Sequence, residues 1–79
     1  MEFSLDSYEC VLPVEVTIDD DNGRYMVRKS DTSGVFFNTP FELIRWIRAH
    51  LQEEEFLKPE DFRSMMGKLA EYEQAGYLG

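Results

Sequence analysis

The chain has 79 residues, a formal net charge of −8 and one cysteine, and 43% of its residues are hydrophobic. This length corresponds to a single domain over residues 1–79, and six Phe, four Tyr and one Trp are too many large side chains for a disordered protein. One Cys excludes an internal disulfide, and no Cys/His set has the spacing of a zinc site. We therefore expect a compact domain that folds without a metal or cofactor.

No apolar run approaches the length of a membrane span, and the N-terminal residues are acidic, unlike those of signal or transit peptides. A free cysteine suits a reducing compartment. These features together predict a cytoplasmic protein, in a bacterial or phage-infected host cell.

Most of the negative charge lies near the N-terminus. The first 23 residues contain seven carboxylates and no Lys or Arg, whereas residues 24–79 carry nine acids against eight bases. The seven are Glu2, Asp6, Glu9, Glu15, Asp19, Asp20 and Asp21. A surface of one sign repels nucleic acid and anionic lipid, and attracts basic protein surfaces over about 8 Å at physiological salt.

Alternating apolar and polar residues predict a sheet within residues 1–38. Phe3 and Leu5 suggest a short extended start. A longer strand follows, with one apolar face: Tyr8, Cys10, Leu12, Val14, Val16 and Ile18. Pro13 cannot donate to a ladder, so this strand lies at an edge, bends or breaks there. Asn22-Gly23 predicts a type I′ hairpin into a second strand over residues 24–30. After a turn over 31–34, a third strand covers 35–37.

Two helices are predicted within residues 39–79. Thr39 suits an N-cap, Pro40 the first helical position, and Glu42 the third position of a capping box. The apolar stripe of this helix is Leu43, Ile44, Ile47 and Leu51. Glu53, Glu54 and Glu55 oppose the helix dipole and favour a stop.

Pro59 opens the second helix, and Gly76 is predicted to end it as the C′ residue, with Tyr77 folding back on Tyr72. Its buried stripe is Phe62, Met65, Met66 and Leu69. The expected fold is therefore α+β: an antiparallel sheet of three strands, or four if Pro13 divides the first, followed by two helices on one face (β-β-β-α-α). The predicted core comprises Leu43, Ile47, Phe62, Met66 and Leu69 with Tyr8, Leu12, Val14, Val16 and Ile18.

The residues that could carry chemistry do not form a recognisable active site. The run from Asp19 to Gly23 fails as a calcium loop, because placing Gly23 sixth puts Ile18 first and Lys29 twelfth. His50 has no nucleophile or second ligand at motif spacing, and Cys10 is predicted to be a buried thiol. We expect a protein that is not an enzyme, with no catalytic, cofactor-binding or metal-binding residues.

The first helix offers a second candidate binding surface. Arg45 and Arg48 are predicted on its outer face, with Trp46 at the edge of the apolar stripe, a combination that can anchor a protein partner. The alternative is a solvated face with local pairs such as Glu42–Arg45. Phe36 and Phe37 are neighbours in one strand, so one is expected in the core and the other is either covered or exposed.

The leading functional prediction is a non-catalytic, acidic protein-binding module. In its sharpest form it is an inhibitor that occupies a basic nucleic-acid-binding surface of a larger complex, with carboxylates replacing phosphates. The order of elements, a small sheet, a Thr39-capped helix and a second helix, resembles some phage-encoded anti-CRISPR proteins, which implies such nucleic-acid mimicry. The predicted partner-binding residues are Glu9, Glu15, Asp19, Asp20, Asp21, Arg45, Trp46 and Arg48.

The alternative is a small host regulatory, adaptor or antitoxin-like protein, with a homodimer as one form. In that case the acidic segment keeps the protein soluble, and a helix face or strand edge binds the partner. In either case we expect no direct binding to nucleic acid and none to membranes, because the acidic surface repels both.

Overall fold

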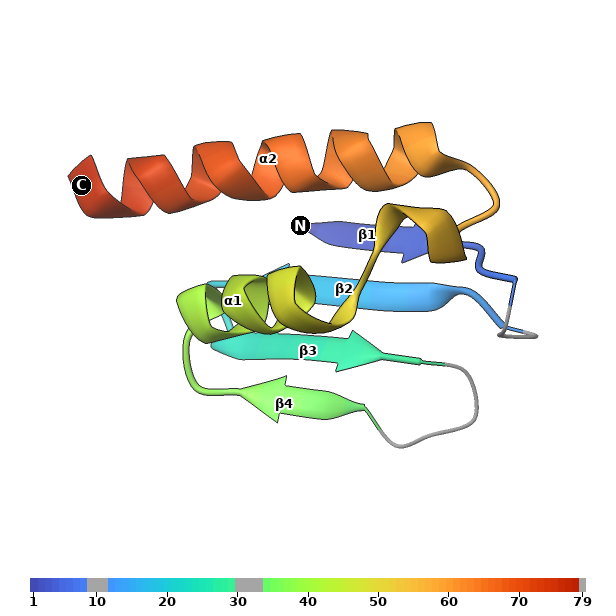
Figure 1. The fold of residues 1–79 in the computed structure, drawn as a ribbon. Helices are drawn as coiled ribbons and strands as arrows, with labels where there is room; N and C mark the ends of the chain where they lie inside the picture. The colour runs from blue at the N-terminus through green and yellow to red at the C-terminus, as the bar shows by residue number, and fades with distance from the viewer. Residues whose placement is uncertain (9–11, 30–33, 79) are drawn as a thin grey trace.

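The structure, a computed structural model, describes residues 1–8, 12–29 and 34–78. One antiparallel sheet in the order β1-β2-β3-β4 is followed by two helices that pack on one of its faces (Figure 1). The elements are β1 (Glu2–Leu5), β2 (Val14–Asp19), β3 (Arg24–Arg28), β4 (Val35–Phe37), α1 (Pro40–His50), the short 3-10 helix η1 (Glu53–Glu55) and α2 (Pro59–Leu78). The predicted α+β fold is confirmed, with four strands.

The strand register divides the side chains between a helix-covered face and an open face. Val14, Val16 and Ile18 of β2 are buried under the helices, as predicted. The open face carries the alternate residues, and cross-strand neighbours place Glu2 beside Thr17, Thr17 beside Met26, and Met26 beside Phe36. Because this face has no helix over it, its residues remain in contact with solvent.

A continuous strand from Tyr8 to Asp19 is wrong, but of the alternatives predicted at Pro13 the break is confirmed. The fourth strand is β1, at the short extended start, and β2 begins only after Pro13. Residues 6–8, after β1, lie beside η1: the Tyr8 amide donates to the Glu55 carbonyl at 3.0 Å, and the Leu57 amide donates to the Asp6 carbonyl at 2.9 Å. Because the backbone of Tyr8 pairs with Glu55 of η1, Tyr8 is not part of the strand that contains Val14.

Two predicted core residues are therefore on the surface. Tyr8 is 68% exposed and Leu12 is 51% exposed. Met66 is only partly buried, whereas its neighbour Met65 is fully buried. Among the described residues, the core is Leu5, Val14, Val16, Ile18, Val27, Leu43, Ile44, Ile47, Leu51, Phe56, Phe62, Met65 and Leu69. The prediction that Cys10 is a buried thiol lies outside the described residues. The turn predicted over residues 31–34 lies mainly outside them, since only Gly34 is described.

The hairpin between β2 and β3 is wider than a two-residue turn. Asp19 pairs with Arg24, so the loop covers residues 20–23. Gly23 has φ 63°, in the left-handed region where a residue without Cβ is favoured. The Asp19 carboxylate accepts from the Asn22 backbone amide at 3.3 Å and from its side-chain Nδ2 at 2.8 Å. These two bonds favour the wider loop, although the positive φ at Gly23 agrees with the sequence.

The start of α1 follows the sequence closely. Thr39 is the N-cap and its hydroxyl accepts from the Glu42 amide at 3.2 Å, with Pro40 in the first turn. The Glu42 carboxylate accepts from the Asn38 amide at 3.2 Å, one residue before the expected partner, Thr39. The bond accepted by Thr39 is thus where the capping box predicts it, and the bond accepted by Glu42 is displaced by one residue. Both bonds lie at the connection between β4 and α1.

Replacing Thr39 with Ala removes the acceptor for the Glu42 amide at the start of α1. We expect Thr39→Ala to lower the free energy of unfolding by about 0.5–2 kcal/mol, measured from the urea midpoint. Thr39→Ser, which retains the hydroxyl, is the control and is expected to lose less. Equal stability of the wild type and Thr39→Ala would show that the cap does not stabilise α1.

The prediction that Gly76 ends the second helix is wrong, because α2 continues to Leu78. An ideal Cβ at Gly76 would lie 2.6 Å from Cζ of Phe41, so the ring of Phe41 occupies the space a side chain would need. Phe41 also contacts Tyr72, with ring centroids 6.3 Å apart. Gly76 therefore lets α1 and α2 approach closely.

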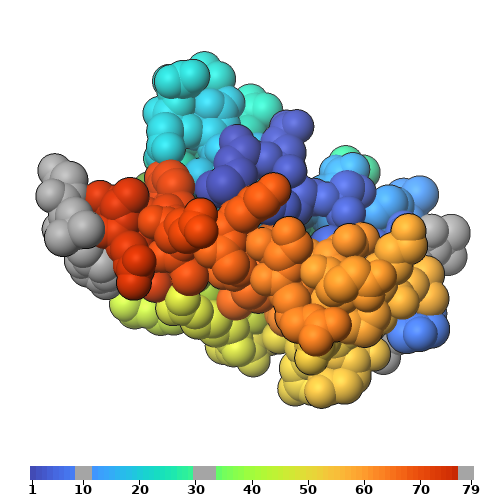
Figure 2. All heavy atoms as spheres, turned by 90° about the horizontal axis from the view of Figure 1, so that it is seen from above, coloured from blue at the N-terminus to red at the C-terminus, as the bar shows by residue number. Residues whose placement is uncertain are grey.

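Helix α2 extends along most of the molecule. Figure 2 shows it between the sheet side, coloured blue to cyan, and α1, coloured yellow-green. Its N-terminal end lies near η1 and its C-terminal part lies near the β2–β3 hairpin (Figure 1). Contacts from one helix therefore reach both ends of the sheet.

Candidate protein-binding surfaces

Charge is divided between two parts of the fold. Residues 24–50, which include β3, β4 and α1, contain five bases and two acids. The flanking residues 1–23 and 51–79, which include β1, β2, η1 and α2, contain fourteen acids and three bases. Since the strand order follows the chain, one side of the sheet carries net negative charge and the β3–β4 side carries net positive charge.

The hairpin acids have different surroundings. The Asp20 carboxylate accepts from the Tyr25 hydroxyl at 2.9 Å and from the Tyr72 hydroxyl at 2.7 Å. Asp20 thereby joins the hairpin to α2, which gives it a structural role that the sequence did not indicate. Asp21 is exposed. Of these two acids, Asp21 is the one whose carboxylate is better placed for a partner.

These hydrogen bonds change the acidities of the groups concerned. Donation to Asp20 raises the pKa of the Tyr25 phenol. Burial, and then the bond to Asp20, raises the pKa of Tyr72. Donation by Asn22 lowers the pKa of Asp19. The two phenols therefore keep their protons at pH values where an isolated tyrosine would ionise.

This cluster predicts an alkaline loss of stability. The unfolded chain loses phenolic protons near pH 10 while Tyr25 and Tyr72 retain theirs in the folded state, so the free energy of unfolding falls as pH rises above about 10. Ultraviolet titration of the tyrosines measures the effect directly. We expect Asp20→Ala to move two phenols to lower pH, and Asp21→Ala, the neighbouring control, to move neither. Identical titrations for the wild type and Asp20→Ala would contradict the assigned role of Asp20.

The strand register places bases opposite two of the predicted binding acids. Glu15 pairs with Arg28 and Asp19 pairs with Arg24 across β2 and β3. Opposite charges at directly paired positions on one face attract each other. The sequence suggested that the acidic segment forms a surface of one sign. At Glu15 and Asp19 it does not, because a base lies opposite each of them.

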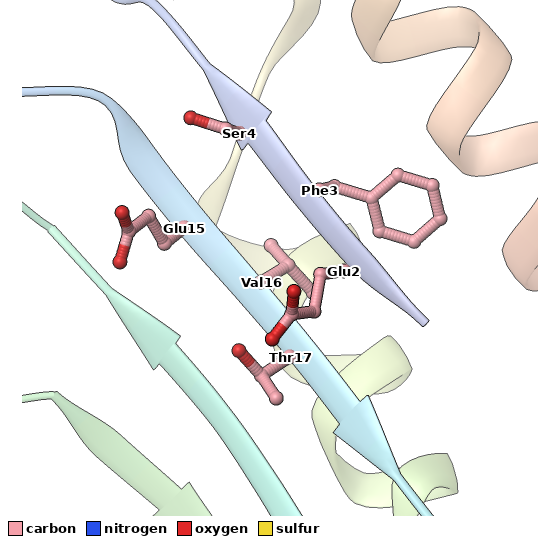
Figure 3. A pocket seen from close by; sticks show the side chains of 6 residues that line it. All are labelled: Glu2, Phe3, Ser4, Glu15, Val16 and Thr17. Carbon is pink, nitrogen blue, oxygen red and sulfur yellow. The ribbon is translucent and has the colours of Figure 1, made fainter.

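A hollow of about 350 Å³ lies over β1 and β2, lined by Glu2, Phe3, Ser4, Glu15, Val16 and Thr17. In Figure 3 the carboxylates of Glu2 and Glu15 and the hydroxyls of Ser4 and Thr17 lie on the open side, whereas Phe3 points toward α2. Glu2 and Glu15 are exposed. Two carboxylates beside two hydroxyls provide hydrogen-bond acceptors suited to Arg or Lys side chains.

A second acidic region lies at the other end of the sheet. The Leu57–Asp6 hydrogen bond brings η1 beside Asp6. The structure thus brings η1 to Asp6 but not to the hairpin acids. Glu53 forms an ion pair with Arg63 at 2.9 Å, and the Gln52 amide donates to the Glu55 carboxylate at 3.0 Å. Part of this acidic charge is therefore already engaged within the fold.

The three α1 residues predicted to share one binding face are separated. Arg48 turns toward α2, where its guanidinium donates to the Glu73 carboxylate at 3.0 and 3.4 Å. Arg45 and Trp46 instead line a groove beside β4. Arg48 is thus a link between the helices, and only Arg45 and Trp46 remain together as a surface.

The groove beside β4 has a volume of about 340 Å³ and is lined by Phe37, Glu42, Arg45, Trp46, Ala49 and His50. The centroids of the Phe37 and Trp46 rings are 6.0 Å apart, and those of Trp46 and His50 are 4.7 Å apart. Phe37 is partly buried and Phe36, on the open face, is 68% exposed, which confirms their predicted opposite orientations. The aromatic rings give the groove an apolar floor.

Glu9, the remaining predicted binding residue, lies outside the described residues. Within residues 1–8, 12–29 and 34–78, no group of three or more His, Cys, Asp or Glu side chains is arranged to hold a metal ion. The helices of the described chain include none with the length and apolar composition needed to cross a membrane. The predictions that the protein is not an enzyme and needs no cofactor stay predictions.

Comparisons with protein-family models, with curated proteins and with solved structures found no match to this chain.

Proposed function

We propose that this chain is a non-catalytic protein-binding module whose acidic side binds a basic surface on a larger protein or complex. The observation that carries this proposal is the division of charge, with fourteen acids and three bases in the residues that flank 24–50. A field of this kind steers a basic partner toward one side of the molecule and fixes its orientation.

The open face beside the hairpin is the part of the acidic side best suited to contact. Glu2 and Glu15 line its hollow, and Asp21 lies at the hairpin tip, all three exposed. Asp20 accepts hydrogen bonds from two tyrosines, so we assign it to positioning the hairpin. The binding set that we propose is therefore Glu2, Glu15 and Asp21, flanked by Asp19.

The sharper form of the proposal is an inhibitor that occupies a surface where the partner otherwise binds nucleic acid. Carboxylates held on strands resemble phosphates in charge and in accepting hydrogen bonds from Arg and Lys. The proposed partner is then a nucleic-acid-binding protein or complex, and this chain itself binds no nucleic acid. The bases opposite Glu15 and Asp19 limit how far the mimicry extends along the sheet.

The test begins with a tagged protein used to isolate partners from its native host cells, identified by mass spectrometry. Binding of the purified partner is then measured over a salt series. We expect Glu2→Gln, Glu15→Gln and Asp21→Asn combined to weaken binding by about tenfold or more at low salt. Unlabelled nucleic acid is expected to compete with the wild-type protein.

The matched control removes the same charge from the other acidic end, with Glu54→Gln, Glu60→Gln and Asp61→Asn. All three positions are exposed, so both triple variants are expected to stay folded. Equal weakening by the two variants would mean that net charge, rather than the open face, drives binding. Unchanged binding of the first variant would remove the acidic-surface proposal.

The alternative function, a regulatory, adaptor or antitoxin-like protein, has one specific observation in its favour. Strand β4 is short and apolar, and its Val35 and Phe36 are exposed. Binding through this edge would depend on apolar contact and backbone hydrogen bonds. Its affinity would therefore change little with salt, whereas binding through the acidic side would weaken steeply.

A further inference from the structure

We propose that the acidic surface binds its basic partner together with Phe36, an exposed aromatic side chain at the β4 end of the same open face. The partner surface that fits is a ridge carrying an Arg or Lys side chain and, three strand spacings or ~14 Å away, an aliphatic side chain. This inference rests on the proposed function and adds an apolar contact to it.

A single row of side chains crosses the open face from β1 to β4. The strand register places Glu2 beside Thr17, Thr17 beside Met26, and Met26 beside Phe36. Figure 3 shows Glu2 and Thr17 at the start of this row. Glu2 is exposed and Phe36 is 68% exposed, so both ends of the row are open to a partner. Neighbouring strands are about 4.8 Å apart, which gives the ~14 Å between the two ends.

Met26 and Phe36 form the apolar end of the row. An ideal Cβ at Gly34 would lie 3.0 Å from both Cγ and Sδ of Met26, so the Met26 side chain extends toward β4 at Gly34. The Met26 side chain is half-buried there, whereas the Phe36 ring stays in solvent. Phe and Met are both enriched at protein–protein interfaces, where the flexible thioether adapts to the partner.

The charges along the row fix the orientation of the partner. The cross-strand neighbour of Glu2 is the uncharged Thr17, and neither β1 nor β2 contains Lys or Arg. Arg24 and Arg28 lie two positions either side of Met26, so they share its face and are exposed. A base on the partner is therefore attracted to the β1 end and repelled from β3, which leaves the aliphatic side chain for the β4 end.

This arrangement differs from a surface that imitates phosphates by charge alone. Salt screens the attraction between exposed charges but does not weaken the burial of apolar surface. Binding that includes Phe36 therefore keeps a part that is insensitive to salt, in addition to the part that Glu2 contributes.

A short basic peptide tests the geometry without the natural partner. The probe is a blocked peptide of arginine, serine, valine, serine and leucine, in which the first and fifth side chains share one side of the extended chain, ~14 Å apart. It is titrated to millimolar concentration into isotope-labelled protein, and amide shifts are followed by nuclear magnetic resonance. We expect saturable shifts at Glu2, Thr17, Met26 and Phe36.

A second peptide of the same composition is the control for geometry. Its order is arginine, valine, serine, leucine and serine, which places arginine and leucine on opposite sides of the extended chain. We expect it to bind about threefold or more weakly than the first peptide, because only one of its two contacts can form at a time.

Three variants separate the two contacts. Phe36→Ala is expected to weaken the first peptide by about fivefold at both low and high salt, and Phe36→Leu by less. Glu2→Gln is expected to weaken it by about threefold at low salt only. Leu57→Ala, which truncates another exposed apolar side chain, lies between η1 and α2 and is expected to leave binding unchanged.

The possible failures are distinguishable. Absence of shifts along the row at millimolar peptide, or equal binding of the two peptides, would overturn the inference. Weakening by Glu2→Gln but not by Phe36→Ala would also overturn it while retaining the acidic surface. Weakening by Phe36→Ala alone would remove the acidic contact from this face, and with it the proposed function, and would favour binding through β4.

Discussion

Phe56→Ala is expected to lower the free energy of unfolding by about 3–5 kcal/mol, the range for truncating a buried aromatic side chain. Phe56 is fully buried, and its ring stacks on Phe62 with centroids 5.0 Å apart and an interplanar angle of 16°. It also forms a bridge with Ser7, so it holds the chain after β1 against η1 and α2. For a domain of this size the loss approaches the whole stability of about 3–5 kcal/mol.

The measurement is urea denaturation followed by circular dichroism, with Leu57→Ala as the control. Leu57 is the next residue in the chain and is 49% exposed, so its truncation is expected to cost much less. A Phe56→Ala protein with a near-native midpoint would show that the segment joining α1 to α2 is not part of the core. Similar losses for both variants would instead indicate an effect on the local backbone.

Ile47→Ala is expected to lower the free energy of unfolding by about 2–5 kcal/mol. Ile47 lies at the centre of the buried stripe of α1 and is fully buried under the helix-covered face of the sheet. Leu12→Ala is the matched control. The alternation of the sequence places Leu12 in the same core, whereas the structure leaves it 51% exposed, so little loss is expected.

The two variants distinguish the observed fold, in which β2 begins at Val14, from a long strand that begins at Tyr8 and buries Leu12. A large loss for Ile47→Ala with a small one for Leu12→Ala supports a strand that begins after Pro13. Comparable losses for both would restore the long first strand. Chemical denaturation suits this comparison because the same slope against urea would show that both variants unfold from a native state of similar compactness.

Several parts of the fold follow from the sequence because they depend on neighbouring residues. The Thr39 cap, the apolar stripe of α1, the Pro59 start of α2 and the positive φ of Gly23 all arise from contacts or backbone preferences within a few positions. The side-chain alternation of Val14, Val16 and Ile18 is equally local, since a strand has a period of two. These features led to the α+β prediction, which is confirmed.

The errors occur where a distant segment competes with the local pattern. Tyr8 alternates correctly for a strand but is paired with the chain at Glu55. Gly76 has the chemistry of a helix end, yet α2 continues past it, and it accommodates the ring of Phe41 from α1. Neither effect is visible in a window of neighbouring residues, because each partner is more than thirty positions away along the chain.

The candidate surfaces show the same division. The sequence by itself determined the total charge, its excess in the first 23 residues and the opposite orientations of Phe36 and Phe37 in their strand. Only the tertiary structure decided that Asp20 holds Tyr25 and Tyr72, that Arg28 lies opposite Glu15, and that Arg48 pairs with Glu73. The physical reason is that charge is additive along a chain, whereas the partner of each charge is set by strand register and helix packing.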